Sequence, residues 1–294
     1  MAILYVFSMN NFRRVVSGLL LLAAATGCVQ QSRQGDTQMD ALLWSTASAE
    51  YEIIARQIFF QAQRQMDRLI TEKDESAALE QQKDFSRLPP AVIVEVDETL
   101  LSNGVFQYQL LSKGEAFNEE TNWAAWVNEA RAKAVPGSLD YVNHATQKGV
   151  MVFYITNRHV SLFEPTWRNL KQLGFPLAQK NQLLMRGAAE SWDWDKQSRR
   201  EVIAKQYRVI QVIGDGLGDF MAKTENMTPE ERREASNTYI AYWGEKWFML
   251  PNPVYGDWEN AILNASNGSG APMSNDPTKA KYRFIRGGES QGVW

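Results

Sequence analysis

Short apolar runs alternate with segments of helical periodicity between residues 91 and 250, and this alternation constrains the fold more than any other feature. Continuous apolar runs are typical of strands buried on both faces, and intervening helices connect such strands in parallel. Strands are expected at 91–96, 149–156, 182–185, 209–213 and 246–250, with helices at 122–133, 162–173 and 196–206. The sequence therefore predicts an α/β fold with a mainly parallel sheet flanked by helices.

Helical periodicity also precedes the first strand. Apolar residues recur at helical spacing from residue 41 to about residue 71, and Pro89-Pro90 ends the charged stretch that follows. The predicted regions are a mostly helical N-terminal region over 41–88 that packs on the core, a core over 89–263 with a cap insert near 104–134, and a loop and C-terminal segment over 264–294.

The N-terminus has the order of a secretory signal. A basic stretch precedes an apolar run, and Cys28, the single cysteine of the chain, follows small residues. This order predicts a signal peptide over 1–27, whose apolar run from Val15 to Ala25 is too short to span a membrane, and a tether over 28–40 that is lipidated at Cys28. An incidental thiol within a cleaved signal is the alternative, and translation could start at Met1 or at Met9.

Composition and the N-terminal signal bound the partners and the location. The net charge is −3 and the pI is about 5.6, so no nucleic-acid partner is expected. One cysteine leaves no disulfide framework, and together with only two histidines it argues against a His/Cys zinc site. The signal predicts an outer-membrane lipoprotein of the cell envelope, facing the periplasm or the surface and contacting the membrane only through its lipid anchor.

Polar clusters fall where ligands collect in a parallel sheet, at the carboxyl ends of strands. Each cluster by itself has an ordinary structural explanation, such as a helix cap, a turn or a solvated charge. Their succession in chain order favours one shared site. The clusters are Glu95 with Asp97, Thr156 with Asn157, Lys196, and Asp215 with Asp219.

These motifs resemble the haloacid dehalogenase superfamily and, within it, the class C acid phosphatases, the bacterial lipoprotein 5′-nucleotidases. The resemblance runs from about Leu42 to about Asn260. It implies a Rossmann-like haloacid dehalogenase core and hydrolysis of nucleoside monophosphates or similar phosphomonoesters. The motifs that carry it are Val96–Asn103, Ala134–Gly137, Val152–Arg158, Gly214–Phe220 and Leu250–Gly256.

The resemblance implies a role for each polar cluster. Glu95 occupies the position of the acid that attacks phosphorus, and Asp97 that of the acid that protonates the leaving oxygen. Thr156 and Asn157 match groups that hold phosphoryl oxygens, and Lys196 matches the amine that neutralises the transferring phosphoryl. Such charge neutralisation and positioning account for most of the catalysis of phosphoryl transfer.

The resemblance also implies a cofactor and a substrate subsite. Mg²⁺ prefers oxygen ligands and keeps waters, so a few carboxylates and a carbonyl suffice to bind it. Stacking of aromatic rings on a nucleobase tolerates any base. A homodimer is the one self-association that we expect, and the motifs do not specify it. The implied metal ligands are Glu95, Asp97, Asp215 and Asp219, and the implied substrate-binding aromatic residues are Trp123, Trp126 and Tyr255.

One position departs from the family pattern. The first acid of the Asp-x-Asp-x-Thr signature is Glu95, whose extra methylene moves its oxygens by about the length of a C–C bond. A misplacement of about 1 Å can cost on the order of 10²-fold in rate. The chain is therefore an active phosphatase with an adapted strand end, a slow or inactive relative that binds nucleotides, or a variant sequence. Because the other motif residues are present, retained or weakened activity is favoured; a structural, adhesin-like role is the weakest alternative.

Overall fold

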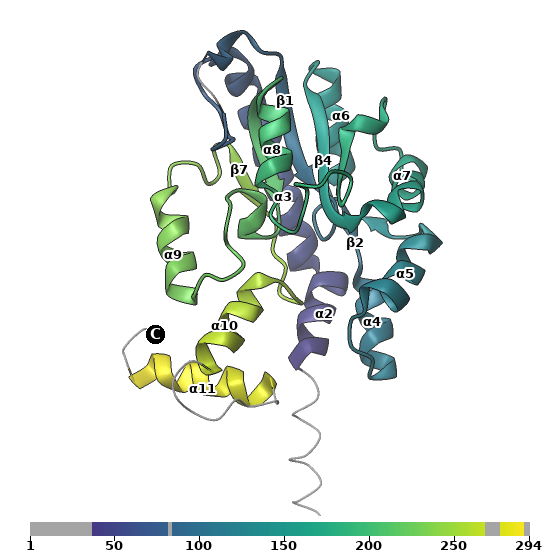
Figure 1. Ribbon diagram of the computed structural model, residues 1–294, viewed down its shortest axis with the longest axis vertical. Coiled ribbons are helices and arrows are strands. Elements are labelled where there is room, and N and C mark those ends of the chain that lie inside the picture. Colours follow the sequence, from purple (N-terminus) through teal and green to yellow (C-terminus); the bar gives the residue numbers. More distant parts are fainter. Residues whose placement is uncertain (1–36, 82–83, 268–276, 291–294) are drawn as a thin grey trace, which may run out of the picture. The chain divides into compact units, whose positions relative to one another are not determined.

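The computed structural model describes residues 37–81, 84–267 and 277–290 (Figure 1). The chain divides into two compact units, residues 1–41 and residues 42–294. The second unit contains the sheet and all of the predicted catalytic residues, and the following description concerns it.

A five-stranded parallel sheet in the order β5-β4-β1-β6-β7 forms the centre of this unit. In β1, Glu95 lies beside Ile155 of β4, and Val94 lies beside Ile213 of β6. The predicted α/β fold with a mainly parallel sheet is therefore confirmed. The strands are β1 Pro90–Glu95, β4 Met151–His159, β5 Leu183–Arg186, β6 Arg208–Gly214 and β7 Trp247–Met249.

Both faces of the sheet are buried, which explains why its strands are continuous apolar runs. Val92 and Val94 of β1 belong to one hydrophobic cluster, while Ala91 and Ile93 belong to a second cluster on the other face. Helices α3, α6 and α7 contribute to the first cluster and α8 to the second (Figure 1). Their bounds are α3 Ala49–Thr71, α6 Ser138–Gln147, α7 Phe163–Gln172 and α8 Gln197–Ala204.

The N-terminal helical run is divided by a cap. Helix α2 spans Thr37–Ala47 and α3 begins at Ala49. Between them Ser48 has an extended backbone, and its hydroxyl accepts a hydrogen bond from the Tyr51 amide at 3.1 Å. A serine N-cap of this kind satisfies a backbone donor that the first helical turn leaves free.

Residues 101–134, which include the predicted cap insert, contain a short hairpin and three helical pieces. The helix expected over 122–133 is shorter than predicted, because the chain leaves it at Ala130 with a φ of +49° and then pairs as β3 with β2. Strand pairing requires extended backbone, so tertiary structure limited this helix. The elements are β2 Leu101–Ser102, α4 Gly104–Lys113, the π-helix η2 Glu119–Trp123, α5 Ala124–Glu129 and β3 Lys133–Ala134.

The C-terminal part is more helical than its composition predicted. Ser266 donates its hydroxyl hydrogen bond to Ile262 at 2.8 Å and lies 2.9 Å from the carbonyl oxygen of Ala280, which joins α10 to α11. Such packing overrides the weak helix propensity of Asn and Ser. Only the part of the predicted loop before residue 268 and after residue 276 is described, and that part is largely helical. The helices of this part that the sequence did not predict are α9 Pro229–Thr238, α10 Asp257–Asn267 and α11 Pro277–Ser290. The sequence also did not predict α4 or α6, which come earlier in the chain.

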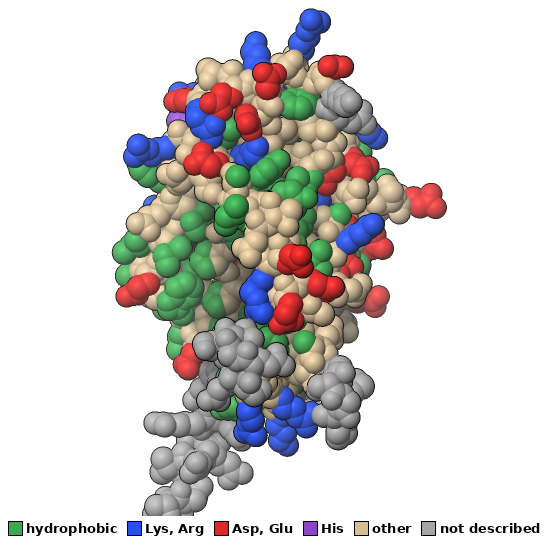
Figure 2. Space-filling view, turned by 90° about the vertical axis from the view of Figure 1, so that its left-hand side faces the viewer, with side chains coloured by type: hydrophobic (Ala, Val, Ile, Leu, Met, Phe, Trp, Pro, Cys, Tyr) green, Lys and Arg blue, Asp and Glu red, His purple; other side chains and the backbone are tan. Residues whose placement is uncertain are grey.

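Short 3₁₀-helices connect several of these elements: η1 Phe85–Arg87, η3 Val160–Leu162, η4 Lys180–Gln182 and η5 Leu217–Asp219. No helix of the described residues is long and apolar enough to cross a membrane. Figure 2 shows acidic and basic side chains interspersed over the upper part of one face, with a group of Lys and Arg at its lower end.

Candidate active site

The carboxyl ends of β1, β4 and β6 bring most of the predicted site residues together. Thr156 at the end of β4 donates its hydroxyl hydrogen bond to Asp97, which follows β1, at 3.1 Å. Asp215, which follows β6, accepts from Thr99 at 3.0 Å. The side chains therefore form one network across three adjacent strand ends, where parallel sheets place their ligands.

Asp97 is held by donors from three directions. Arg158 Nη2 donates to Asp97 Oδ1 at 2.8 Å, and Arg158 Nε lies 3.1 Å from both carboxylate oxygens. Asn103 Nδ2 donates to Oδ1 at 2.9 Å. The Arg158 side chain is 1% exposed and the Asp97 side chain 16% exposed, so the cation is buried while the carboxylate keeps partial access to the surface. Sequence reasoning did not select Arg158 or Asn103, although both stand inside the motifs that it identified.

The Glu95 side chain turns back over the end of its own strand. Its Oε1 accepts the Asp97 backbone amide at 3.3 Å, and its Oε2 pairs with the Lys196 ammonium. Glu95 is 6% exposed. The extra methylene is thus accommodated by folding the carboxylate toward the backbone rather than by extending it away from the strand.

Lys196 joins Glu95 to Asp219. Its ammonium pairs with both carboxylates, and burial lowers the pKa of Lys196 below its ordinary value. Asp219 also closes the turn after β6, because its Oδ2 accepts the amides of Asp215 at 3.1 Å and Gly216 at 2.9 Å. Asp219 therefore has a structural task in addition to its ion pair.

Two further carboxylates, Asp215 and Glu98, form no ion pair with a Lys or Arg of the part of the chain that the structure describes. Asn252 donates to Asp215 at 2.9 Å, and burial followed by the charge of Asp219 raises the pKa of Asp215 to about 7. Tyr255 donates its hydroxyl to Glu98 at 3.1 Å, and burial followed by the charge of Asp215 raises the pKa of Glu98 to about 8. This side of the site therefore concentrates negative charge.

The predicted metal ligands do not converge as one set. In the described part of the chain no group of three or more His, Cys, Asp or Glu side chains is arranged to hold a metal ion. The ammonium of Lys196 lies between two of the four predicted ligands, Glu95 and Asp219. The donor chemistry nevertheless fits Mg²⁺, because the neighbouring Asp97 and Asp215 supply oxygens and the cluster holds excess negative charge.

Thr156 and Asn157 are engaged within the protein. The Thr156 hydroxyl proton goes to Asp97. Asn157 donates to the Trp194 carbonyl at 2.9 Å and accepts from Arg199 at 2.6 Å. Asn157 and Arg199 thereby fasten the loop that carries Lys196. The structure places Asn157 as a support of that loop, a role that the sequence did not predict.

The predicted aromatic contacts need correction. Trp126 is 2% exposed, its indole donates to Asn103 at 2.8 Å, and Phe106 stacks on its ring. Trp123 is 8% exposed and is covered by Phe106 and by Arg158. Both rings already pack against protein, so neither presents a free face to a nucleobase. Tyr255 is half-buried and lies beside the acid cluster through its bond to Glu98.

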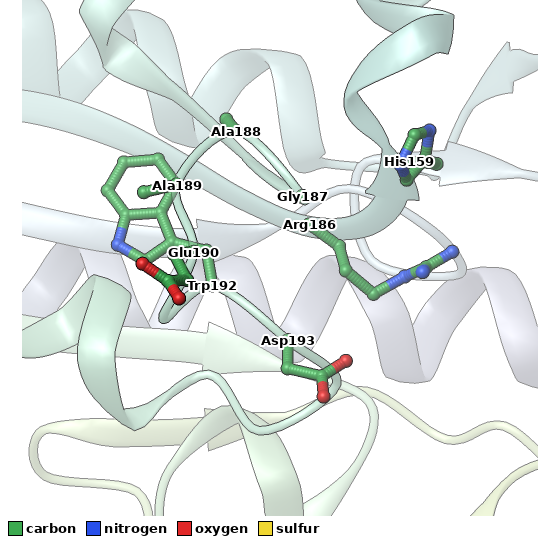
Figure 3. A pocket seen from close by; sticks show the side chains of 8 residues that line it. All are labelled: His159, Arg186, Gly187, Ala188, Ala189, Glu190, Trp192 and Asp193. Atoms are coloured by element: carbon green, nitrogen blue, oxygen red, sulfur yellow. The ribbon is translucent and has the colours of Figure 1, made fainter.

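An open cavity of about 420 Å³ lies beside these groups, at the ends of β4 and β5 (Figure 3). Arg186 Nε donates to the Asn157 carbonyl at 3.1 Å, which links the cavity wall to the site, and its guanidinium lies 4.1 Å from the Trp194 ring centroid. The lining residues are His159, Arg186, Gly187, Ala188, Ala189, Glu190, Trp192 and Asp193. None of them is a predicted catalytic residue.

A family model described as "HAD superfamily, subfamily IIIB (Acid phosphatase)" matches residues 22–258 of the chain. The chain belongs to this family. A crystal structure of a class C acid phosphatase from Bacillus anthracis with tungstate bound is similar over 84% of this chain and 96% of that one, with a TM-score of 0.71 and 29% identity. The family assignment agrees with the predicted haloacid dehalogenase superfamily membership.

Curated relatives match over a shorter stretch. A stem 31 kDa glycoprotein of Glycine max is 31% identical over 166 residues, 54% of this chain and 57% of the relative. Acid phosphatase 1 of Solanum lycopersicum is 26% identical over 167 residues, 55% of this chain and 57% of the relative. The chain thus spans somewhat more than half the length of these curated relatives.

These relatives contradict the predicted location. They are plant proteins, and bacterial outer-membrane lipoproteins are not among them. A basic stretch, an apolar run and small residues are common to secretory signals in general, so one cysteine after them does not specify a lipid anchor. The prediction of an outer-membrane lipoprotein is therefore wrong, and Cys28 itself lies outside the described residues.

Proposed function

We propose that this chain hydrolyses phosphomonoesters as an acid phosphatase, with nucleoside monophosphates as a substrate class and Mg²⁺ as its cofactor. One observation carries the proposal. Two carboxylates that are two residues apart at the end of β1 each pair with a separate buried cation, Asp97 with Arg158 and Glu95 with Lys196. Family membership and the similar class C acid phosphatase structure support it.

The proposed chemistry assigns two steps to these side chains. In the first, a Glu95 oxygen attacks phosphorus while the ester P–O bond breaks, and the leaving oxygen takes a proton from Asp97. In the second, water attacks phosphorus, Asp97 takes its proton, and the bond to Glu95 breaks to release phosphate. Lys196 offsets the negative charge of the phosphoryl group during both steps.

Mg²⁺, when bound, would supply further positive charge to the phosphoryl oxygens. The residues that would hold it are Asp215, Glu95 and the backbone carbonyl of Asp97. Asp215 has both oxygens oriented by fixed donors, Thr99 at 3.0 Å and Asn252 at 2.9 Å. Such support fixes the direction of a ligating carboxylate.

Tyr255 is the aromatic residue that best suits contact with the organic part of the substrate. Its hydroxyl is fixed by Glu98 at 3.1 Å, whereas Trp123 and Trp126 are covered by protein. A fixed ring beside the acid cluster can stack on any nucleobase. This argument supports nucleotides as substrates without selecting one base.

The test is an assay of purified protein on p-nitrophenyl phosphate and nucleoside monophosphates at acidic pH, with Mg²⁺ and with EDTA. We expect Mg²⁺-dependent release of phosphate that Lys196→Ala reduces strongly. Turnover that does not exceed the Lys196→Ala background would refute the proposed activity.

A binding protein without catalysis is the second candidate, and one observation favours it. Both oxygens of Glu95 are already engaged, by the Asp97 amide and by Lys196. Glu95→Asp separates the candidates. A large gain in kcat would mean that Glu95 limits an otherwise competent site, and equal activity would mean that the site is adapted to glutamate. Nucleotide binding by calorimetry without product from either form would favour the binding protein.

A further inference from the structure

Arg158 is buried at the end of β4 with its three guanidinium nitrogens on fixed partners. Nη2 donates to Asp97 Oδ1 at 2.8 Å, Nε contacts both Asp97 oxygens at 3.1 Å, and Nη1 donates to Thr166 Oγ1 at 3.2 Å. The guanidinium carbon lies 5.4 Å from the centre of the Trp123 ring. A planar fork that is held at its edges and over one face cannot turn without breaking several contacts.

The two oxygens of Asp97 differ in their remaining capacity to accept. Oδ1 accepts from Asn103 Nδ2 at 2.9 Å and from two nitrogens of Arg158. Oδ2 accepts from Thr156 Oγ1 at 3.1 Å and shares only the Nε of Arg158. Oδ1 therefore has three donors, whereas Oδ2 has two, one of which (Arg158 Nε) it shares with Oδ1. Because a carboxylate oxygen has about two lone-pair sites, Oδ1 is crowded and Oδ2 is the oxygen that is more open to a further partner.

We propose that Arg158 is a positioning residue that fixes Asp97 so that Oδ2 exchanges the proton with the leaving oxygen of the substrate. This inference rests on the proposed phosphomonoesterase function. In the step concerned, the ester P–O bond breaks, its electron pair stays on the leaving oxygen, and that oxygen takes the proton from Asp97 Oδ2. Trp123, on the π-helix of the cap, supports the guanidinium from its face.

A second buried arginine shows what a purely structural role looks like. Arg208 is 2% exposed and donates to backbone carbonyls, those of Leu69 at 2.8 Å, Ile70 at 2.9 Å and Glu72 at 3.0 Å. These carbonyls belong to the end of α3 and the residue after it. Arg208→Lys is therefore a matched control that disturbs a buried guanidinium away from the acid network.

The experiment compares kcat/KM for two esters that differ in their need for a proton. p-Nitrophenolate leaves readily without protonation, whereas the alkoxide of glycerol phosphate does not. Since general acid catalysis contributes about 10²-fold or more, Arg158→Lys is expected to lower kcat/KM for glycerol phosphate by about 10²-fold and for p-nitrophenyl phosphate by less than about tenfold. Arg208→Lys is expected to change both esters by the same factor.

Equal losses on both esters in Arg158→Lys would overturn the inference and leave the proposed function standing. Wild-type protein that hydrolyses neither ester, with or without Mg²⁺, would refute the proposed function and this inference together. If Arg158→Lys does not fold, Thr166→Val, which removes only the Nη1 contact, replaces it. That variant is expected to show a smaller loss confined to glycerol phosphate, and a loss shared by both esters would again refute the inference.

Discussion

The two acids that follow β1 are held by different kinds of cation. Asp97 pairs with Arg158, a rigid fork from β4 that contacts both of its oxygens. Glu95 pairs with Lys196, whose single ammonium is shared with Asp219. A guanidinium imposes orientation, whereas an ammonium acts as a point charge. The β4 side of the site therefore sets geometry, and the Lys196 side sets the charge balance.

The largest expected effect is on the β4 side. Asp97→Ala is expected to lower kcat/KM on glycerol phosphate, whose leaving oxygen needs a proton, by about 10² to 10⁴-fold. It should also lower the free energy of unfolding by about 3 to 5 kcal/mol, because Arg158 stays buried without a counter-ion. Urea denaturation measures the second effect.

The matched control for this change is Asp140→Ala, since Asp140 is an exposed acid in the first turn of α6. We expect its free energy of unfolding to stay within about 0.5 kcal/mol of the wild type. If Asp97→Ala also left the free energy of unfolding unchanged, the buried Arg158 would not need its counter-ion. The difference proposed between the β4 side and the Lys196 side would then be wrong.

On the Lys196 side, charge should matter more than shape. Lys196→Met leaves Glu95 and Asp219 facing each other without a cation, and we expect kcat to fall by about 10²-fold. Lys196→Arg keeps the charge and is expected to recover part of that loss. Steady-state kinetics on both variants test this expectation. If kcat of Lys196→Arg is as low as that of Lys196→Met, the position of the ammonium matters more than its charge.

Asp215 predicts a pH dependence of stability. The pKa of Asp215 is about 7 in the folded protein against an ordinary value of 3.8, so the folded state binds more protons than the unfolded state between these values. The free energy of unfolding should therefore fall as the pH rises through this window, by up to about 1.4 kcal/mol for each pKa unit. Asp215→Asn should flatten the slope.

Urea denaturation at several pH values in EDTA measures this slope. Added Mg²⁺ is expected to reduce it, because a cation that binds only the folded state stabilises the ionised carboxylates. A slope of the opposite sign would show that Asp215 is ionised and stabilised in the folded protein without metal.

The smallest effect is expected at the edge of the acid cluster. Tyr255→Phe removes the hydroxyl that donates to Glu98 at 3.1 Å, which should cost about 1 kcal/mol of unfolding free energy. Tyr108→Phe, at a ring that is 56% exposed, is the control and should change nothing measurable. If Tyr108→Phe lowered the free energy of unfolding as much as Tyr255→Phe, the hydrogen bond from Tyr255 to Glu98 would not be the cause of the loss.

Sequence patterns located the site but not its internal pairing. Glu95, Asp97, Thr156, Lys196, Asp215 and Asp219 do meet at one edge of the sheet, because parallel strands end together. Asp219 was predicted to be a metal ligand, but it pairs with Lys196 and closes the turn after β6. Trp126, predicted to contact substrate, became a core residue that holds Asn103. Homodimer formation stays a prediction.

The sequence by itself determined the parallel sheet, the edge at which the polar residues gather, and the family. Continuous apolar strands and strand-end motifs are local features, so they can be recognised without knowing any contact. Tertiary structure alone decided which cation holds which acid, since Arg158 is 61 residues from Asp97 and Lys196 is 101 residues from Glu95. Such pairs depend on strand register and side-chain direction, and these are fixed only when the sheet has assembled.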